Sequence, residues 1–159
     1  MNQVYLLTGS NLGDRKLQLE TAGNLIGERI GAVKRQSSVY ETASWGKTDQ
    51  PDFYNQVLLV GTNLSAHEVL MEILAIEREL GRERHEKWGS RLIDIDILFF
   101  NDEIIKEDQL IVPHPFLHQR RFTLVPLNEI APTLKHPELH LTIQELLINL
   151  DDKLVVNRI

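Results

Sequence analysis

Residues 82–100 read Arg-Glu-Arg-His-Glu-Lys-Trp-Gly-Ser-Arg-Leu-Ile-Asp-Ile-Asp-Ile-Leu-Phe-Phe, a basic segment followed by a strand with two carboxylates. Successive side chains of an extended strand point to opposite faces. Asp94 and Asp96 therefore share one face of this strand, and the isoleucines around them share the other. Leu98 and Phe100 are expected to continue the aspartate face in apolar form, which predicts that this face is partly covered by protein.

The pair of aspartates indicates a cation site. Like charges on a covered face raise each other's pKa and resist ionisation unless a cation lies between them. Mg²⁺ is commonly held by one or two carboxylates together with substrate phosphates. Guanidinium groups match phosphate oxygens, and the preceding segment supplies cations and one indole: Arg82, Arg84, Lys87, Trp88 and Arg91. A cation site next to these basic residues predicts a polyphosphate ligand.

A simpler interpretation of the same residues stays open. Asp94 and Asp96 could lie on the solvated face of an edge strand, with the basic residues paired to Glu83 and Glu86. The apolar continuation of the aspartate face favours a cleft at the margin of a covered sheet.

Composition narrows the class of protein. A chain of 159 residues, 42% of them hydrophobic, can bury one compact core, so a single domain over residues 1–159 is expected. The net charge of −6 argues against a nucleic-acid partner. The lack of cysteine excludes disulfides and thiolate metal sites. Without a leader-like N-terminus or a long apolar run, we expect a cytoplasmic protein with no membrane partner.

The order strand, helix, strand, strand, helix, strand is predicted over residues 3–100. Strands are expected at residues 3–9, 33–40 and 53–60, and in the segment that carries the two aspartates. This is the order of a ferredoxin-like α+β sandwich, a βαββαβ fold with an antiparallel sheet. C-terminal additions are expected as a short helix at 142–150 and a terminal strand at 154–156.

Both predicted helices carry start signals. The first follows the turn at residues 10–14, and its apolar stripe is expected to be Leu17, Thr21, Ala22, Leu25 and Ile26. The second begins with the capping box of Ser65 and Glu68, and Gly81 is placed to terminate it. The loop from Gly9 to Gly13 lacks the lysine of a P-loop and is interpreted as a structural turn.

Two further ionisable residues have open interpretations. Glu77 borders the apolar stripe of the second helix near the C-terminus of that helix, where the helix dipole disfavours an anion. It is therefore expected to have a cationic partner or a ligand, and the alternative is a glutamate exposed to solvent. His114 lies between two prolines, which make the segment stiff and extended. A lone histidine is usually structural, but the nearby pair Arg120-Arg121 favours a phosphate contact.

Several motifs together resemble the 6-hydroxymethyl-7,8-dihydropterin pyrophosphokinases of folate biosynthesis. They are Gly9-Ser10-Asn11-Leu12, Gln50-Pro51-Asp52-Phe53-Tyr54-Asn55, Gly81-Arg82, Trp88-Gly89, Arg91-Leu92-Ile93-Asp94-Ile95-Asp96-Ile97-Leu98, Val112-Pro113-His114-Pro115 and Pro126-Leu127. The resemblance covers about residues 3–135, and its most specific block is residues 81–99.

The resemblance implies that an intact diphosphate passes from ATP to the hydroxymethyl group of 6-hydroxymethyl-7,8-dihydropterin, with release of AMP. Two Mg²⁺ ions bound by Asp94 and Asp96 would bridge the triphosphate, and the pterin hydroxyl would attack the β-phosphorus in line. The arginine-rich loop would close over ATP and exclude water. ATP and the pterin are the expected partners of a monomeric enzyme.

The resemblance also assigns individual residues. The catalytic set is Arg82, Arg91, Asp94 and Asp96, and the ATP contacts are Glu77, Arg84, Lys87, Trp88, Arg91, Ile97, His114 and Arg120. The pterin would stack between Phe53 and Phe122, with its polar edge read by Asn55 and the loop at Thr42. The full set of pterin contacts is Thr42, Ala43, Trp45, Phe53, Asn55 and Phe122.

The chain departs from the family pattern at several positions: Lys87 replaces an arginine, Ser90 a proline and Phe53 a frequent tyrosine, while Ala43 and Trp45 alter a proline-rich wall. These changes affect affinity and rate more than reaction type. One rival is another two-metal enzyme such as a nucleotidyltransferase, which keeps the aspartates but does not need the aromatic pair. The other is a non-enzymatic ferredoxin-like module that binds nucleic acid, which the acidic charge opposes.

Overall fold

The computed structural model describes residues 1–43, 52–81 and 92–159. Its elements up to the aspartate strand are β1 (Asn2–Ser10), α1 (Arg15–Arg29), β2 (Ala32–Gln36), β3 (Tyr40–Thr42), β4 (Phe53–Thr62), α2 (Ala66–Glu79) and β5 (Asp94–Phe100). They are followed by β6 (Ile105–Lys106), β7 (Ile111–Val112), a 3₁₀ turn (Leu117–Gln119), α3 (Arg121–Ile130), α4 (Ile143–Ile148) and β8 (Val156–Arg158).

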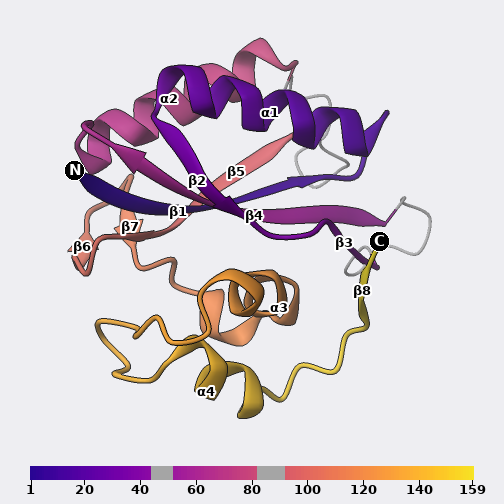
Figure 1. The fold of residues 1–159 in the computed structure, drawn as a ribbon, viewed down its shortest axis with the longest axis vertical. Helices are drawn as coiled ribbons and strands as arrows, with labels where there is room; N and C mark the ends of the chain where they lie inside the picture. Colours follow the sequence, from indigo (N-terminus) through magenta and orange to yellow (C-terminus); the bar gives the residue numbers. More distant parts are fainter. Residues whose placement is uncertain (44–51, 82–91) are drawn as a thin grey trace.

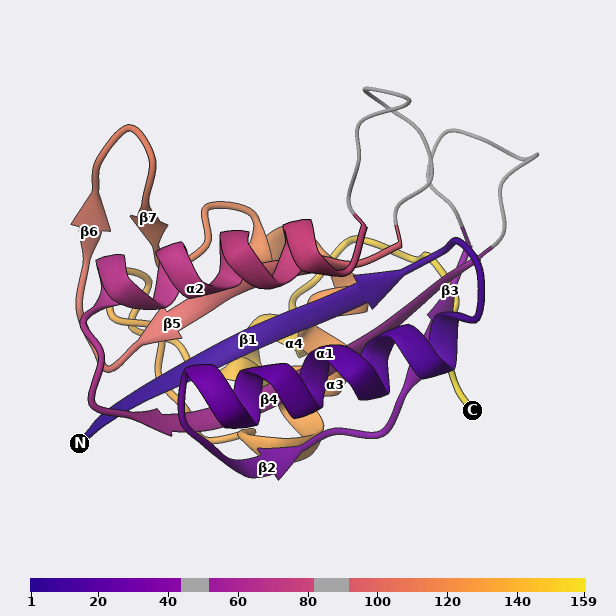
Figure 2. The ribbon, with the colours of Figure 1, turned by 90° about the horizontal axis from the view of Figure 1, so that it is seen from above.

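Six of the described strands form one sheet in which all pairs are antiparallel, and β6 and β7 form a separate antiparallel pair. The order of the six-stranded sheet is β5-β1-β4-β3-β8, and β2 also pairs with β4. Helices α1 and α2 lie side by side on one face, and α3 and α4 lie against the other (Figures 1 and 2). The prediction of a ferredoxin-like sandwich with C-terminal additions is confirmed. Within the described residues, no helix is long and apolar enough to cross a membrane.

Both long helices begin where their capping residues predict. Asp14 accepts a hydrogen bond from the backbone N–H of Leu17 at the start of α1. At α2, the Ser65 hydroxyl accepts from the N–H of Glu68 at 3.2 Å, and the Glu68 carboxylate accepts from the N–H of Ser65 at 2.9 Å. This is the predicted capping box. Gly81 follows the end of α2 with φ of 85°, as expected for a terminating glycine.

Two apolar layers enclose the sheet. The layer under α1 and α2 includes Leu19, Ala22 and Ile26, spaced at three and four residues. The prediction that Leu17 belongs to this stripe is wrong, since its side chain is 53% exposed. The layer on the α3 and α4 side is built from the opposite face of the strands and from those two helices: Tyr5, Leu7, Val57, Leu98, Phe99, Leu124, Leu127, Ile143 and Leu146.

A register shift in the β1–β5 pair changes the face of the last residues of β5. Tyr5 pairs with Phe99, whereas Leu6 pairs with Ile97, so Leu98 is an extra residue in the ladder. Leu98 lies on the aspartate face as predicted. Phe100 packs with the isoleucines in the α1 and α2 layer instead. The prediction for Phe100 is wrong because strict alternation cannot continue through a bulge.

Two predicted strands differ in their limits. The strand expected at residues 33–40 is divided into β2 and β3, and Ser37 between them exchanges hydrogen bonds with Val57 at 2.9 Å in both directions. The C-terminal strand expected at 154–156 begins at Val156, and it pairs with β3. The sheet is therefore extended beyond β3 by the end of the chain.

Glu129 of α3 joins this helix to β3. Its carboxylate accepts hydrogen bonds from the N–H and the hydroxyl of Ser38, both at 3.0 Å, and from the Tyr40 hydroxyl at 2.7 Å. Burial opposes ionisation of Glu129, but these hydrogen bonds and the charge of Arg158 lower its pKa overall. Burial and the Glu129 carboxylate together raise the pKa of Tyr40 to about 12. The shared carboxylate thus anchors α3 to the sheet.

A buried histidine predicts a loss of stability in acid. His136 is 4% exposed, and its Nδ1 accepts from the N–H groups of Glu138 and Leu139, both at 3.1 Å. Burial lowers the pKa of His136 below the ordinary 6.5, and the charges of His118 and His140 act in the same direction. The charge of Glu138 opposes this shift. Below pH 6.5 the unfolded chain binds this proton more readily than the folded chain, so the free energy of unfolding should decrease as the pH falls.

The contribution of His136 to the pH dependence of the free energy of unfolding is measured with His136→Asn. This variant keeps an acceptor oxygen near the same place but does not titrate. Urea denaturation between pH 7 and pH 5 should give a shallower dependence on pH for this variant than for the wild type. The exposed His67 provides the control as His67→Asn. Equal slopes for wild type and His136→Asn would contradict the assignment.

Candidate active site

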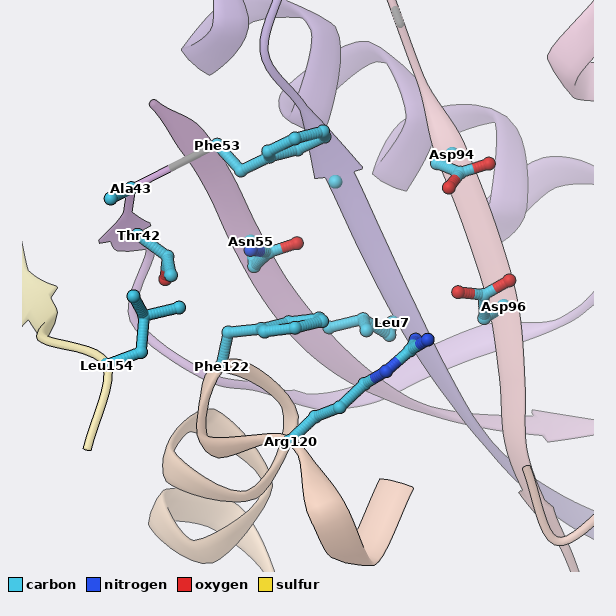
Figure 3. A pocket seen from close by; sticks show the side chains of 11 residues that line it. Leu7, Thr42, Ala43, Phe53, Asn55, Asp94, Asp96, Arg120, Phe122 and Leu154 are labelled. Atoms are coloured by element: carbon cyan, nitrogen blue, oxygen red, sulfur yellow. The ribbon is translucent and has the colours of Figure 1, made fainter. Parts of the chain in front are cut away.

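A cavity of about 160 Å³ opens on the α3 side of the sheet, beyond the part that α3 and α4 cover. Strands β1, β3, β4 and β5 form its floor and the start of α3 forms one wall (Figure 3). Eight of its residues were predicted as site residues: Thr42, Ala43, Phe53, Asn55, Asp94, Asp96, Arg120 and Phe122. Among the described residues, Leu7, Gly9 and Leu154 also line the cavity and were not predicted.

The two phenylalanines form an aromatic slot. Phe53 comes from the start of β4 and Phe122 from the first turn of α3, and their rings lie on opposite sides of the cavity (Figure 3). Asn55 lies between them on the floor and is 5% exposed. Thr42 lies at the end farther from the aspartates, and its buried hydroxyl has no hydrogen-bond partner within the described part of the chain. A flat ligand with a polar edge would fit this slot.

Asp94 and Asp96 border the other side of the cavity. Both project from β5 toward it (Figure 3). Among residues 1–43, 52–81 and 92–159, no group of three His, Cys, Asp or Glu side chains could hold a metal. Two carboxylates with remaining positions for water and phosphate suit Mg²⁺, which seldom uses an all-protein cage. The donor set therefore fits Mg²⁺ shared with a phosphorylated ligand.

Glu77 holds β5 from its outer edge. Its carboxylate accepts a hydrogen bond at 2.9 Å from the N–H of Ile95, which lies between the two aspartates. Glu77 is only 3% exposed, so the alternative of a solvated glutamate is wrong. Among the strands that the structure describes, β5 is the end strand of the sheet, and the Glu77 side chain thus pairs an N–H on its outer edge.

His114 and Arg120 approach the cavity from the segment before α3. The His114 Nδ1 accepts from the N–H of Phe116 at 3.2 Å. Burial and the charge of Arg120, opposed by Asp94, lower the pKa of His114 to about 4. His114 is therefore neutral near pH 7, and we assign its proton to Nε2, which could donate to a ligand. The Arg120 guanidinium lies 5.2 Å from the Phe116 ring centre and 5.5 Å from that of Phe122.

Three predicted site residues that the structure describes do not line the cavity: Glu77, Ile97 and His114. Ile97 lies on the opposite face of β5 from the aspartates, in the layer under α1 and α2. Glu77 supports β5 from its edge, and His114 lies outside the lining. Six predicted residues lie outside the described residues: Trp45, Arg82, Arg84, Lys87, Trp88 and Arg91.

Gly9 is a site residue that the sequence interpretation assigned to a turn. It lies within β1, where it pairs with Asn55 on one side and Asp94 on the other. A Cβ at this position would lie 2.6 Å from the Asn55 Oδ1. Only a glycine therefore leaves room for the Asn55 amide in its observed orientation. A glycine within a predicted strand is the signal that could have indicated this close approach.

The chain is similar to known proteins in its family profile, its sequence and its structure. The profile of the family described as 7,8-dihydro-6-hydroxymethylpterin-pyrophosphokinase matches residues 5–132. The 2-amino-4-hydroxy-6-hydroxymethyldihydropteridine pyrophosphokinase of Aquifex aeolicus is 44% identical over 137 residues, which cover 86% of this chain and 85% of that enzyme. The enzyme of the same name from Bacillus subtilis is 45% identical over 131 residues, 82% of this chain and 78% of that enzyme.

Solved structures support the fold. The HPPK-DHPS of Plasmodium falciparum, solved with STZ-DHP, superimposes with a TM-score of 0.76 at 21% identity. The match covers 92% of this chain and 45% of that one, so the present chain spans less than half of the solved protein.

The contact between Gly9 and Asn55 generates a prediction about stability. Gly9→Ala should lower the free energy of unfolding by about 1–3 kcal/mol, because the new methyl group collides with the Asn55 amide. Asn55→Ala removes the colliding oxygen, so the double variant should be more stable than the sum of the single changes implies. Urea denaturation of the four proteins measures this coupling.

Gly27 provides a matched control on α1, where nothing lies within 4 Å of an added Cβ. Gly27→Ala should stabilise the protein by about 0.5–1 kcal/mol through helix propensity. Additive effects of the Gly9 and Asn55 substitutions would contradict the proposed collision.

Proposed function

The chain belongs to the 7,8-dihydro-6-hydroxymethylpterin-pyrophosphokinase family, and we propose that it transfers the diphosphate of ATP to the hydroxymethyl group of 6-hydroxymethyl-7,8-dihydropterin. It is thus an ATP-dependent diphosphotransferase of folate biosynthesis. We further propose that residues 1–159 act as one domain, since both apolar layers pack against a single sheet. The proposal that the enzyme is a monomer rests on the family resemblance.

The pterin is assigned to the aromatic slot. Phe53 and Phe122 would cover its two faces, while Asn55 and Thr42 would meet its polar edge. Stacking selects a planar ring, and the buried amide and hydroxyl add hydrogen-bond selectivity. The slot opens toward Asp94 and Asp96, so the hydroxymethyl group would point to the side where the phosphates are held.

The triphosphate is assigned to the carboxylate side. Asp94 and Asp96 would hold two Mg²⁺ ions, which when bound neutralise phosphate charge and align the groups for in-line transfer. Arg120 and the Nε2–H of His114 would donate to phosphate oxygens. The cations of residues 82–91 are assigned to the same triphosphate, and closure of that segment over ATP would exclude water. Their charge and the family resemblance support this assignment.

The observation that carries the proposal is that the aromatic slot and the carboxylate pair open into one cavity. A nucleotidyltransferase would use the two carboxylates but has no need of a slot that suits a flat heterocycle beside them. The reaction is tested by incubating the protein with Mg²⁺, ATP and the pterin, then identifying the nucleotide product. AMP is expected, and ADP as the product would reject the diphosphate transfer.

The carboxylates can be tested individually. Asp94→Asn and Asp96→Asn should each reduce kcat by about 10³-fold or more at saturating Mg²⁺, because loss of a metal ligand removes several kcal/mol of transition-state stabilisation. Circular dichroism should show an intact fold. The exposed Asp102 provides the control as Asp102→Asn, which should retain wild-type turnover. Normal turnover in either cavity variant would rule out the metal assignment.

The aromatic slot predicts a separation between the two substrates. Phe122→Ala should weaken pterin binding by about 1–3 kcal/mol through lost ring burial and stacking, with little change in nucleotide binding. Isothermal titration with each ligand measures both effects. Phe116 is 49% exposed and does not line the cavity, so Phe116→Ala controls for loss of an aromatic ring nearby. Lost nucleotide binding with normal pterin binding in Phe122→Ala would mean that the substrates are reversed.

A further inference from the structure

The C-terminal segment, residues 150–159, contributes to the cavity although it lies beyond residue 132, where the match to the family ends. Leu154 lines the cavity between Thr42 and Phe122, on the side away from the aspartates (Figure 3). Its side chain is half-buried, whereas the neighbouring Val155 is 65% exposed. The alternation turns one side chain of this segment toward the cavity and the next toward solvent.

Asp152 attaches the segment to the start of α3. Its Oδ2 accepts a hydrogen bond from the N–H of Arg121 at 3.0 Å, and its Oδ1 accepts from the N–H of Leu154 at 2.8 Å. Arg120, at the N-cap position of α3, makes no side-chain capping bond. Asp152 thus supplies from a distant part of the sequence an acceptor for the first turn of α3. That turn carries Phe122.

The other end of the segment is attached to β3. Val156 pairs with Thr42 and Arg158 pairs with Tyr40 in an antiparallel ladder. The N–H of Ile159 donates to the carbonyl of Val39 at 3.0 Å. Leu154 therefore lies between two fixed points, one beside Phe122 and one beside Thr42, and its position follows from both attachments.

We propose that Leu154 is a specificity-determining residue of the pterin site, where it closes the slot against the 2-amino end of the ring. This inference rests on the proposed function. If the 6-hydroxymethyl group points toward Asp94 and Asp96, the 2-amino group, which is diagonally opposite on the bicyclic ring, points toward Thr42 and Leu154. The isobutyl side chain of Leu154 would occupy the space that a substituent on this amino group needs, and it would shield the hydrogen bonds of the amino group from water.

The test uses Leu154→Ala with two substrates, the natural pterin and its N2-methyl analogue. The wild type should strongly prefer the natural pterin. In the variant, the ratio of kcat/KM for the analogue to that for the natural pterin should rise by about tenfold or more, the discrimination that a methyl-sized change in a pocket produces. KM for ATP should not change. Val155→Ala, an exposed neighbour, should behave like the wild type with both substrates.

Asp152 is tested as a positioning residue. Asp152→Ala removes both hydrogen bonds and should raise KM for the natural pterin several-fold while kcat and KM for ATP stay near their wild-type values. Asp152→Asn keeps one acceptor oxygen and should restore much of the lost affinity. A uniform loss of activity that follows thermal stability would indicate a purely structural role.

Failure of this inference is distinguishable from failure of the proposed function. If the wild type forms no AMP from ATP and the natural pterin, the proposed function is wrong. If the wild type is active but accepts the N2-methyl analogue equally well, or if Leu154→Ala leaves the preference unchanged, the role of Leu154 is wrong and the proposed function stands.

Discussion

The repulsion between the carboxylates of Asp94 and Asp96 is the constraint on which the site depends. Two anions at alternate positions of one strand stay on the same face only while the strand keeps its extended geometry. β5 is held on its inner edge by the ladder to β1 and on its outer edge by Glu77, which accepts from the N–H between the two aspartates. The backbone thus keeps both charges directed at one cavity, where a cation can offset their repulsion.

The elements of the fold were largely predictable because their signals are local. The capping box at Ser65 and the alternation in β5 as far as Leu98 each involve a few neighbouring residues, and both appear in the structure as predicted. The errors arise where tertiary pairing overrides a local period. Phe100 changes face because the partner strand skips Leu98, and Leu17 is exposed because the sheet contacts a different stripe of α1.

The site was predictable where residue type and the family resemblance agreed. Phe53, Asn55 and Phe122 meet in one cavity as expected, although they come from β4 and α3. The helix-dipole argument predicted a cationic partner or a ligand for Glu77, whereas the structure shows a backbone N–H of β5 as a hydrogen-bond donor to it. The position of Leu154 in the cavity could not be predicted from the sequence. A leucine in a short terminal segment carries no local pattern that shows which strand the segment will pair with.

The hydrogen bonds of Glu129 have a consequence for how the protein opens locally. Because one carboxylate binds both Ser38 and Tyr40, α3 cannot leave the sheet without breaking its hydrogen bonds to the segment that leads to Thr42, which then keeps its pairing with β4 and β8. Arg35 adds a bond from β2 to the carbonyl of Ile130 at the other end of the helix. Local opening of the Phe122 wall therefore also removes part of the support of the Thr42 end of the slot, although the two ends come from separate elements.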